Sequence, residues 1–314
     1  MPPRLVPSPR SLTRLALAGG VAGAAALAYG AAEARAYTLR HVTVPTLPAG
    51  ADPLRVLHLS DLHLVPTQQR KRDWVAGLAA LAPDLVVDTG DNLAHLEAVP
   101  ALLEALGGLL DVPGVFVHGS NDYFSPEPRN PMRYLRPDDG WRATHTPPLP
   151  WKELSRAFVD AGWVDLTNTS ASLDVRGVRL AFAGVDDPHL GYDRLDRVDA
   201  RADPSADVRL GVAHAPYLRV LDHFAARGYD GILAGHTHGG QVCLPWGRAL
   251  TTNCDLDTAR ARGLHRHPAD SRPGDAGSAW MHVSAGLGTN PYSRVRVACR
   301  PEATLLTLAP VDAA

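Results

Sequence analysis

The sequence of 314 residues has few cysteines, few lysines and almost no net charge, and these scarcities exclude several classes of protein. The cysteines are Cys243, Cys254 and Cys299, an odd number at no metal-binding spacing, so we expect no disulfide framework. Lysine occurs only at Lys71 and Lys152, which we attribute to the base composition of the gene. A formal net charge of −2 implies no nucleic-acid partner.

The N-terminal region contains an uncharged apolar run at residues 15–32, near the lower limit of roughly 17–25 residues for a spanning helix. The basic residues before it are Arg4, Arg10 and Arg14. This asymmetry favours an inside N-terminus and an exported body. Residues 34–36 also fit a signal-peptide cleavage site. We expect residues 1–36 to be a membrane anchor rather than a cleaved signal, which places the protein at the cell membrane with its catalytic domain outside the cytoplasm.

Apolar strands alternate with helical segments through residues 54–311, which predicts one α/β domain with a sheet buried on both faces. Residues 37–53 are expected to be a linker that includes an edge strand at 37–44. We expect strands at 54–60, 84–88, 114–118, 163–166, 170–175, 178–183, 208–213, 230–234, 280–284, 293–299 and 303–308. The expected helices are 68–82, 100–110, 151–161 and 217–227. Two long polar segments are interpreted as a lid or substrate wall (123–150) and an irregular surface excursion (248–275).

Metal-ligand side chains stand at the ends of five of these apolar runs. Asp61 and His63 are two residues apart, and on extended backbone their side chains point the same way. The other candidate ligands are Asp91, Asn121, His214, His236 and His238. In α/β sheets, ligands bind at the carboxyl ends of the strands, where these residues are expected.

This ligand set exceeds one coordination sphere, so we expect two divalent ions that share a carboxylate, for which Asp91 is the best candidate. Aspartate, asparagine and histidine suit Mn, Fe, Ni or Zn, and the absence of a thiolate argues against a structural zinc site. Gly90 and Gly235 directly precede ligands, where a strand must turn sharply without a Cβ.

The sequence resembles the calcineurin-like metallophosphoesterases over about residues 54–309. The matching motifs are Asp61-x-His63, Gly90-Asp91, Gly119-Ser-Asn-Asp122, Ala213-His214 and Gly235-His-x-His238. The run from Gly235 to Gln241 and the Gly286-Leu-Gly-Thr289 loop resemble its membrane-associated branch, which includes phosphodiesterases and lipid-precursor pyrophosphatases. The resemblance implies a four-layer αββα sandwich with a dinuclear centre at one sheet edge. It assigns one ion to Asp61, His63, Asp91 and His238, and the other to Asp91, an asparagine, His214 and His236.

One motif departs from the family, which has Gly-Asn-His-Asp where this chain has Gly119-Ser-Asn-Asp122. A flush alignment makes Ser120 the ligand, whereas a slip of one residue makes it Asn121, which we favour because a carboxamide oxygen is the better ligand. The histidine expected near the leaving group is missing in both registers. His145 and His189 are candidate substitutes. Three other histidines are interpreted as structural: His58, His95 and His118.

The expected function is metal-assisted hydrolysis of a phosphodiester, phosphomonoester or pyrophosphate, with a bridging hydroxide as nucleophile. Asp91, Asn121 and His214 are the residues expected to carry the chemistry, and the substrate is expected to be a phosphoester, with a lipid-linked one as an option. The alternative is a phosphoester-binding or sensing module with a degraded, weakly active centre. Asp186 and Asp187 either enter the site or form a turn before Pro188.

Overall fold

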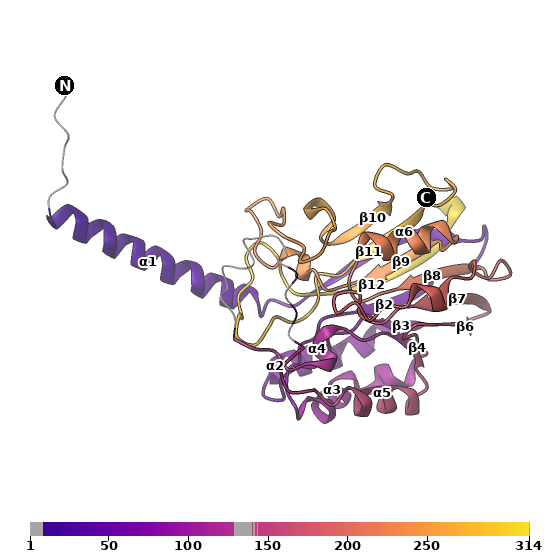
Figure 1. Cartoon of the computed structure of the whole chain (residues 1–314), viewed down its shortest axis with the longest axis horizontal. Helices are drawn as coiled ribbons and strands as arrows, with labels where there is room; N and C mark the ends of the chain where they lie inside the picture. The colour runs from indigo at the N-terminus through magenta and orange to yellow at the C-terminus, as the bar shows by residue number, and fades with distance from the viewer. Residues whose placement is uncertain (1–8, 129–139, 141, 143, 314) are drawn as a thin grey trace, which may run out of the picture.

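The computed structural model describes residues 9–128, 140, 142 and 144–313, which form two mixed β-sheets flanked by helices (Figure 1). The strands of the first sheet are β1 (Thr38–Leu47), β2 (Leu54–Leu59), β3 (Leu85–Asp88), β4 (Gly114–Phe116), β5 (Val164–Asp165) and β12 (Glu302–Pro310). Their order is β1-β12-β2-β3-β4-β5, in which only the β12–β2 pair is antiparallel. The α/β class predicted from the sequence is therefore confirmed.

The second sheet has the same number of strands and a parallel centre. Its strands are β6 (Thr169–Val175), β7 (Val178–Gly184), β8 (Val208–Val212), β9 (Gly231–Ala234), β10 (Gly263–His267) and β11 (Ala279–Val283). The order is β10-β11-β9-β8-β7-β6, with antiparallel pairs at the two edges only. The hairpin expected across Arg176 and Gly177 is the β6–β7 pair.

Helices cover the outer faces of both sheets, which gives the four layers that the sequence resemblance implied. The helices are α2 (Gln69–Ala76), α3 (Ala98–Leu106), α4 (Ser120–Tyr123), α5 (Trp151–Asp160) and α6 (Leu218–Ala226). In α5, Leu154 and Phe158 are one helical turn apart and both are buried in the core that the helices form with the first sheet. A second core, which includes Val87 and Val212, fills the space between the sheets, and α6 packs on the second sheet.

Helix α1 (Pro9–Glu33) extends away from the body and contacts it only near its end (Figure 1). There the backbone N–H of Arg296 donates to the Gly30 carbonyl, and the N–H of Cys299 donates to the Glu33 carboxylate. Among the residues that the structure describes, no helix is long and apolar enough to cross a membrane. The membrane anchor expected for residues 1–36 stays a prediction.

Two expectations about the C-terminal half are wrong. The segment 248–275 was expected to be irregular, yet it contains β10, an edge strand that is half-buried and polar and so carries no apolar pattern. The strand expected at 293–299 does not form, because the backbone N–H of Arg296 donates to the Gly30 carbonyl and only Val297 makes an isolated bridge, with Val242. The 123–150 segment lies partly outside the described residues, at 129–139, 141 and 143, so its interpretation as a lid stays a prediction.

Candidate metal centre

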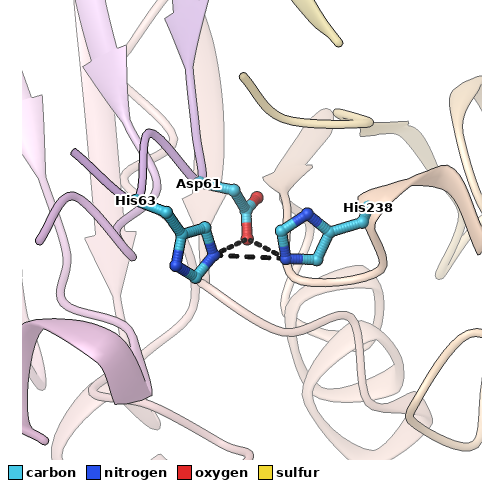
Figure 2. Close-up of side chains that lie close together, drawn as sticks. All are labelled: Asp61, His63 and His238. Atoms are coloured by element: carbon cyan, nitrogen blue, oxygen red, sulfur yellow. Dashed lines mark hydrogen bonds and ion pairs between the residues drawn. The ribbon is translucent and has the colours of Figure 1, made fainter. Parts of the chain in front are cut away.

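The loops after the strands bring all seven predicted ligands to one edge of the two sheets. Figure 2 shows Asp61 and His63 from the loop after β2 converging with His238 from the loop after β9. The Nε2 atoms of His63 and His238 are 3.2 Å apart, and they lie 4.0 and 3.6 Å from Asp61 Oδ1. Asp61 is fully buried and His63 is nearly so, which makes this group an enclosed set of one carboxylate and two imidazoles.

A second group consists of Asp61, Asp91 and His214, and it shares Asp61 with the first. Asp91 Oδ2 lies 3.4 Å from Nε2 of both His63 and His214, so this carboxylate stands between the two groups. The imidazole of His214 is oriented by its Nδ1, which lies 2.7 Å from the Thr89 carbonyl and donates to it when neutral. This hydrogen bond leaves Nε2 of His214 to face Asp91.

Asn121 and His236 complete the candidate set through contacts with the two carboxylates. Asn121 donates to both oxygens of Asp91, from its backbone N–H at 2.7 Å and from its side-chain amide at 2.8 Å. The N–H of His236 donates to the Asp61 carboxylate, and its Nε2 lies 3.1 Å from the Asn253 carbonyl. Ser120 lies beside Asn121, and both residues line the cavity described below. The choice between them as ligand stays a prediction.

The backbone at the site is unusual, because the candidate ligands Asp61, His63, Asp91, His236 and His238 have φ between 41° and 68°. Residues other than glycine rarely adopt this left-handed conformation. Gly90 also has a positive φ, of 89°. Gly235 is required by close approach, since a Cβ there would overlap Ser60 Oγ and lie 2.5 Å from Asp61 Oδ2. The expectation that glycine is needed before these ligands agrees with this geometry.

Burial keeps most of the imidazoles neutral, which is the state that binds metal. It lowers the pKa of His63 and His236 to about 4 and that of His238 to about 3. Burial also opposes the charges of Asp91 and His214, but their mutual attraction outweighs it. The pKa of Asp91 is therefore lowered well below its ordinary value, and that of His214 is raised well above it.

These groups fit divalent metal ions. Buried Nε2 of His214 has no hydrogen-bond partner among the described residues, although it faces a carboxylate oxygen. Nε2 of His63 and of His238 lie 3.2 Å apart beside the Asp61 carboxylate, so a single cation could contact all three groups. Two buried carboxylates with neutral imidazoles form a hard-to-borderline ligand set.

A cavity of about 120 Å³ opens over these residues. His189 lines it and its ring lies 4.4 Å from that of His236, between ring centres. His145 is instead on the surface, where it bonds to Glu127. The Asp187 carboxylate accepts the N–H groups of His189 and Leu190. This is the turn at Pro188 that the sequence analysis gave as one of two alternatives.

Several supporting residues could not be recognised from the sequence. The Asp122 carboxylate accepts the backbone N–H groups of Gly119, Asp91 and Asn92, and so fixes the loop that carries Asp91. Its place in the Gly119–Asp122 motif was the available signal. Fully buried Arg296 donates to the carbonyls of Ala285, Gly286 and Gly288, and nothing in its local sequence indicates this role.

The histidines interpreted as structural lie away from the cavity. His58 belongs to a buried chain of hydrogen bonds through Thr89 and Ser60 to Asp61. Its Nδ1 is 2.9 Å from Nδ1 of His282. His118 bonds to Ser155, and His95 is exposed.

The fold and this site define a class of protein. The chain belongs to the calcineurin-like phosphoesterase family, whose sequence profile matches residues 54–240. It is accordingly a hydrolase of a family that uses divalent metal ions.

Among individual proteins, the chain is similar to an uncharacterized metallophosphoesterase of Bacillus subtilis, YkoQ, with 27% identity over 80% of this chain and 82% of that protein. It is 24% identical to the UDP-2,3-diacylglucosamine pyrophosphatase LpxG of Chlamydia trachomatis, over 81% of this chain and 83% of that one. A Bos taurus transmembrane protein with a metallophosphoesterase domain is 30% identical over 68% of this chain and 46% of its own length.

Two larger proteins of known structure also match. They are the sulfate thiohydrolase SoxB of Thermus thermophilus, with 16% identity and a TM-score of 0.37, and the NAD nucleotidase of Haemophilus influenzae, with 11% identity and a TM-score of 0.43. These matches cover 74% and 76% of this chain. The chain spans about half of their length, 52% and 46%.

Proposed function

We propose that this protein hydrolyses phosphoesters at a dinuclear metal centre. The observation that supports the proposal most directly is the position of Asp91 Oδ2, which lies 3.4 Å from Nε2 of both His63 and His214 beside an open cavity. Asp61, His63, Asp91 and His238 would hold one ion, and Asp91, Asn121, His214 and His236 the other. Two divalent ions, when bound, would supply an activated water near neutral pH and neutralise the charge of the phosphoryl oxygens.

The residues of this chain have distinct tasks in that reaction. Asp91 lies between the two groups, and Asn121 holds its carboxylate by two hydrogen bonds. The Thr89 carbonyl holds the His214 ring in the orientation that directs Nε2 at Asp91. Such fixed orientation lowers the cost of assembling the reacting groups.

The substrate we propose is a phosphodiester, phosphomonoester or pyrophosphate, with a lipid-linked pyrophosphate as the leading example. The relative LpxG is named for a pyrophosphatase activity on a lipid precursor. Pyrophosphate also suits a site without the family's histidine beside the leaving group, because a departing phosphate needs no proton.

The test is the metal content and turnover of three purified variants. Asp91→Ala should remove both ions and abolish hydrolysis of a generic aryl phosphodiester, whereas His63→Ala should weaken chiefly one ion. His95→Ala is the control, since this exposed residue lies outside the cavity. A stoichiometry of one ion in the wild type that Asp91→Ala leaves unchanged would refute the dinuclear centre. Bound metal without turnover would favour the phosphoester-binding module.

We also propose that the protein works at the cell envelope, with its catalytic domain outside the cytoplasm. The support is the placing of Arg4, Arg10 and Arg14 before the apolar run, together with apolar side chains of α1 that are exposed, such as Val21 and Leu27. Fractionation and protease treatment of intact spheroplasts test both parts. A domain that is protected from protease, or that fractionates with the cytosol, contradicts the proposal.

A further inference from the structure

A second cavity, of about 350 Å³, lies where the foot of α1 meets the start of α2 and the loop after β11. Its size is within the range of small-molecule sites, roughly 300–1,000 Å³. The charged residues that line it are all cationic: Arg35, Arg70, Lys71 and Arg294. No aspartate or glutamate is among its described lining residues, although acidic residues slightly outnumber basic ones in the chain.

These four cations differ from nearby arginines in how they are paired. Arg40 pairs with Glu302, and Arg72 pairs with Glu104. Within the described part of the chain, no ion pair involves any of the four pocket cations. The Arg294 guanidinium donates only to a backbone carbonyl, that of Pro291. The pocket therefore concentrates positive charge that the protein itself does not neutralise.

Lys71 shows that the pocket reaches into the protein interior. Its side chain is 3% exposed, and its Nζ donates to the Leu62 carbonyl at 2.6 Å. Burial, together with the charges of Arg296 and Arg294, lowers the pKa of Lys71 to about 7. A buried ammonium beside other cations is costly, and a bound anion would reduce that cost.

We propose that this pocket is an anion site, separate from the metal centre, that binds a phosphate group carried by an anionic lipid headgroup or by a soluble phosphate. Arginine guanidinium groups match phosphate oxygens in geometry and charge. The segment 289–294 divides the two cavities, because Asn290 and Ser293 line the metal centre whereas Thr289 and Arg294 line the basic pocket.

The position of α1 favours the lipid as the source of that phosphate. The end of α1 borders the pocket through Ala31, and Val21, Leu27 and Tyr29 farther along the helix are 63%, 65% and 55% exposed. Tyr292, two residues before the pocket residue Arg294, is 58% exposed. Apolar and aromatic side chains beside a basic cluster are typical of surfaces that associate with anionic membranes.

Vesicle flotation of the full, metal-loaded chain tests this site. Vesicles of phosphatidylcholine that contain phosphatidylglycerol are compared with vesicles of phosphatidylcholine alone. Any insertion of α1 contributes equally to binding of both kinds of vesicle and therefore cancels in the comparison. Each arginine near an anionic surface contributes about fivefold in affinity. The double variant Arg70→Gln/Arg294→Gln should therefore lose on the order of tenfold or more of the preference for phosphatidylglycerol.

The matched control is Arg176→Gln/Arg194→Gln, which removes the same charge from exposed side chains outside the pocket. It should keep the preference. Both double variants should keep wild-type turnover, which would show that they fold. Flotation does not depend on turnover, so it tests the pocket even if the protein has no hydrolase activity.

A second arm measures calorimetric binding of inorganic phosphate to the chelated protein, where the metal centre no longer contributes. Loss of lipid preference in the pocket variant alone identifies the headgroup as the source. Phosphate binding that the same variant abolishes identifies a soluble phosphate. If the pocket variant matches the control in both arms, the anion site is refuted.

Discussion

At the scale of single residues, the ligands are held in backbone conformations that are costly for their residue types. Asp61, His63, Asp91, His236 and His238 are all left-handed, and such residues typically cost about 1–3 kcal/mol each. The hydrogen bonds of Asp122 and Arg296 to the surrounding loops help to hold these conformations. The convergence of the candidate ligands could be predicted from the strand-end pattern, but their backbone strain could not, because it arises from contacts distant in sequence.

The dependence of rate on the leaving group is the prediction that belongs to this scale. General acid help is typically worth 10²–10⁴-fold and matters most for strongly basic leaving groups. Because the family's histidine is absent, we expect a steep fall in rate as the pKa of the leaving group rises across substituted aryl and alkyl esters. Pyrophosphates and acidic phenols should react fastest.

Of the two candidate substitute acids, only His189 lines the cavity with the ligands. A flat dependence in the wild type that becomes steep in His189→Ala would show that His189 has taken the role, and the prediction would fail. His145→Ala is the control, since His145 is bonded to Glu127 at the surface.

At the scale of elements, buried apolar runs made most strands of the sheets predictable, since β2, β3, β8 and β9 are almost fully buried. Polar edge elements were not predictable in the same way. The pattern of β10 is half-exposed, and its strand character comes from pairing with β11. Register and pairing partners depend on the whole sheet, so local sequence cannot supply them.

The prediction at this scale concerns Gly235, which lies between β9 and the loop that contains His236. Gly235→Ala should force the Ser60 side chain or the loop to move, since its Cβ would overlap Ser60 Oγ. We expect a loss of about 1–3 kcal/mol in the free energy of unfolding and a clear fall in bound metal. Urea unfolding and elemental analysis measure the two effects.

Gly77→Ala is the matched control for that substitution. Gly77 has a helical φ of −63°, and a Cβ there would contact nothing within 4 Å. Alanine should therefore be neutral or stabilise the protein by up to about 1 kcal/mol through the unfolded chain. Equal metal content in both variants would show that close packing at Gly235 does not position the ligands.

At the scale of the whole molecule, buried neutral histidines make stability sensitive to acid. His58 and His282 face each other between the sheets, and burial lowers the pKa of His282 to about 3 and that of His58 well below its ordinary value. In the unfolded chain each would take up a proton near pH 6.5. The contribution of this pair to stability is therefore full above about pH 6.5 and is lost as the pH falls from there toward 3.

At pH 5, His282 alone should account for a loss of about 2 kcal/mol in the free energy of unfolding. Urea unfolding of the chain across this pH range measures the loss. His282→Asn should flatten the profile, whereas the exposed His95→Asn should leave it unchanged. Wild-type and His282→Asn profiles that run parallel between pH 7 and 5 would contradict the prediction.

The insertion of β12 between β1 and β2 has a consequence for how the protein is made. The first sheet is split until residues 302–310 exist, because β1 pairs with β12 and not with β2. The Asp61 loop is likewise held by backbone bonds from Leu287 and Gly288. A nascent chain on the ribosome can thus form the β2–β5 ladder but not a finished ligand loop. Any metal ions held by this loop would consequently bind only after residues 287–310 have left the ribosome.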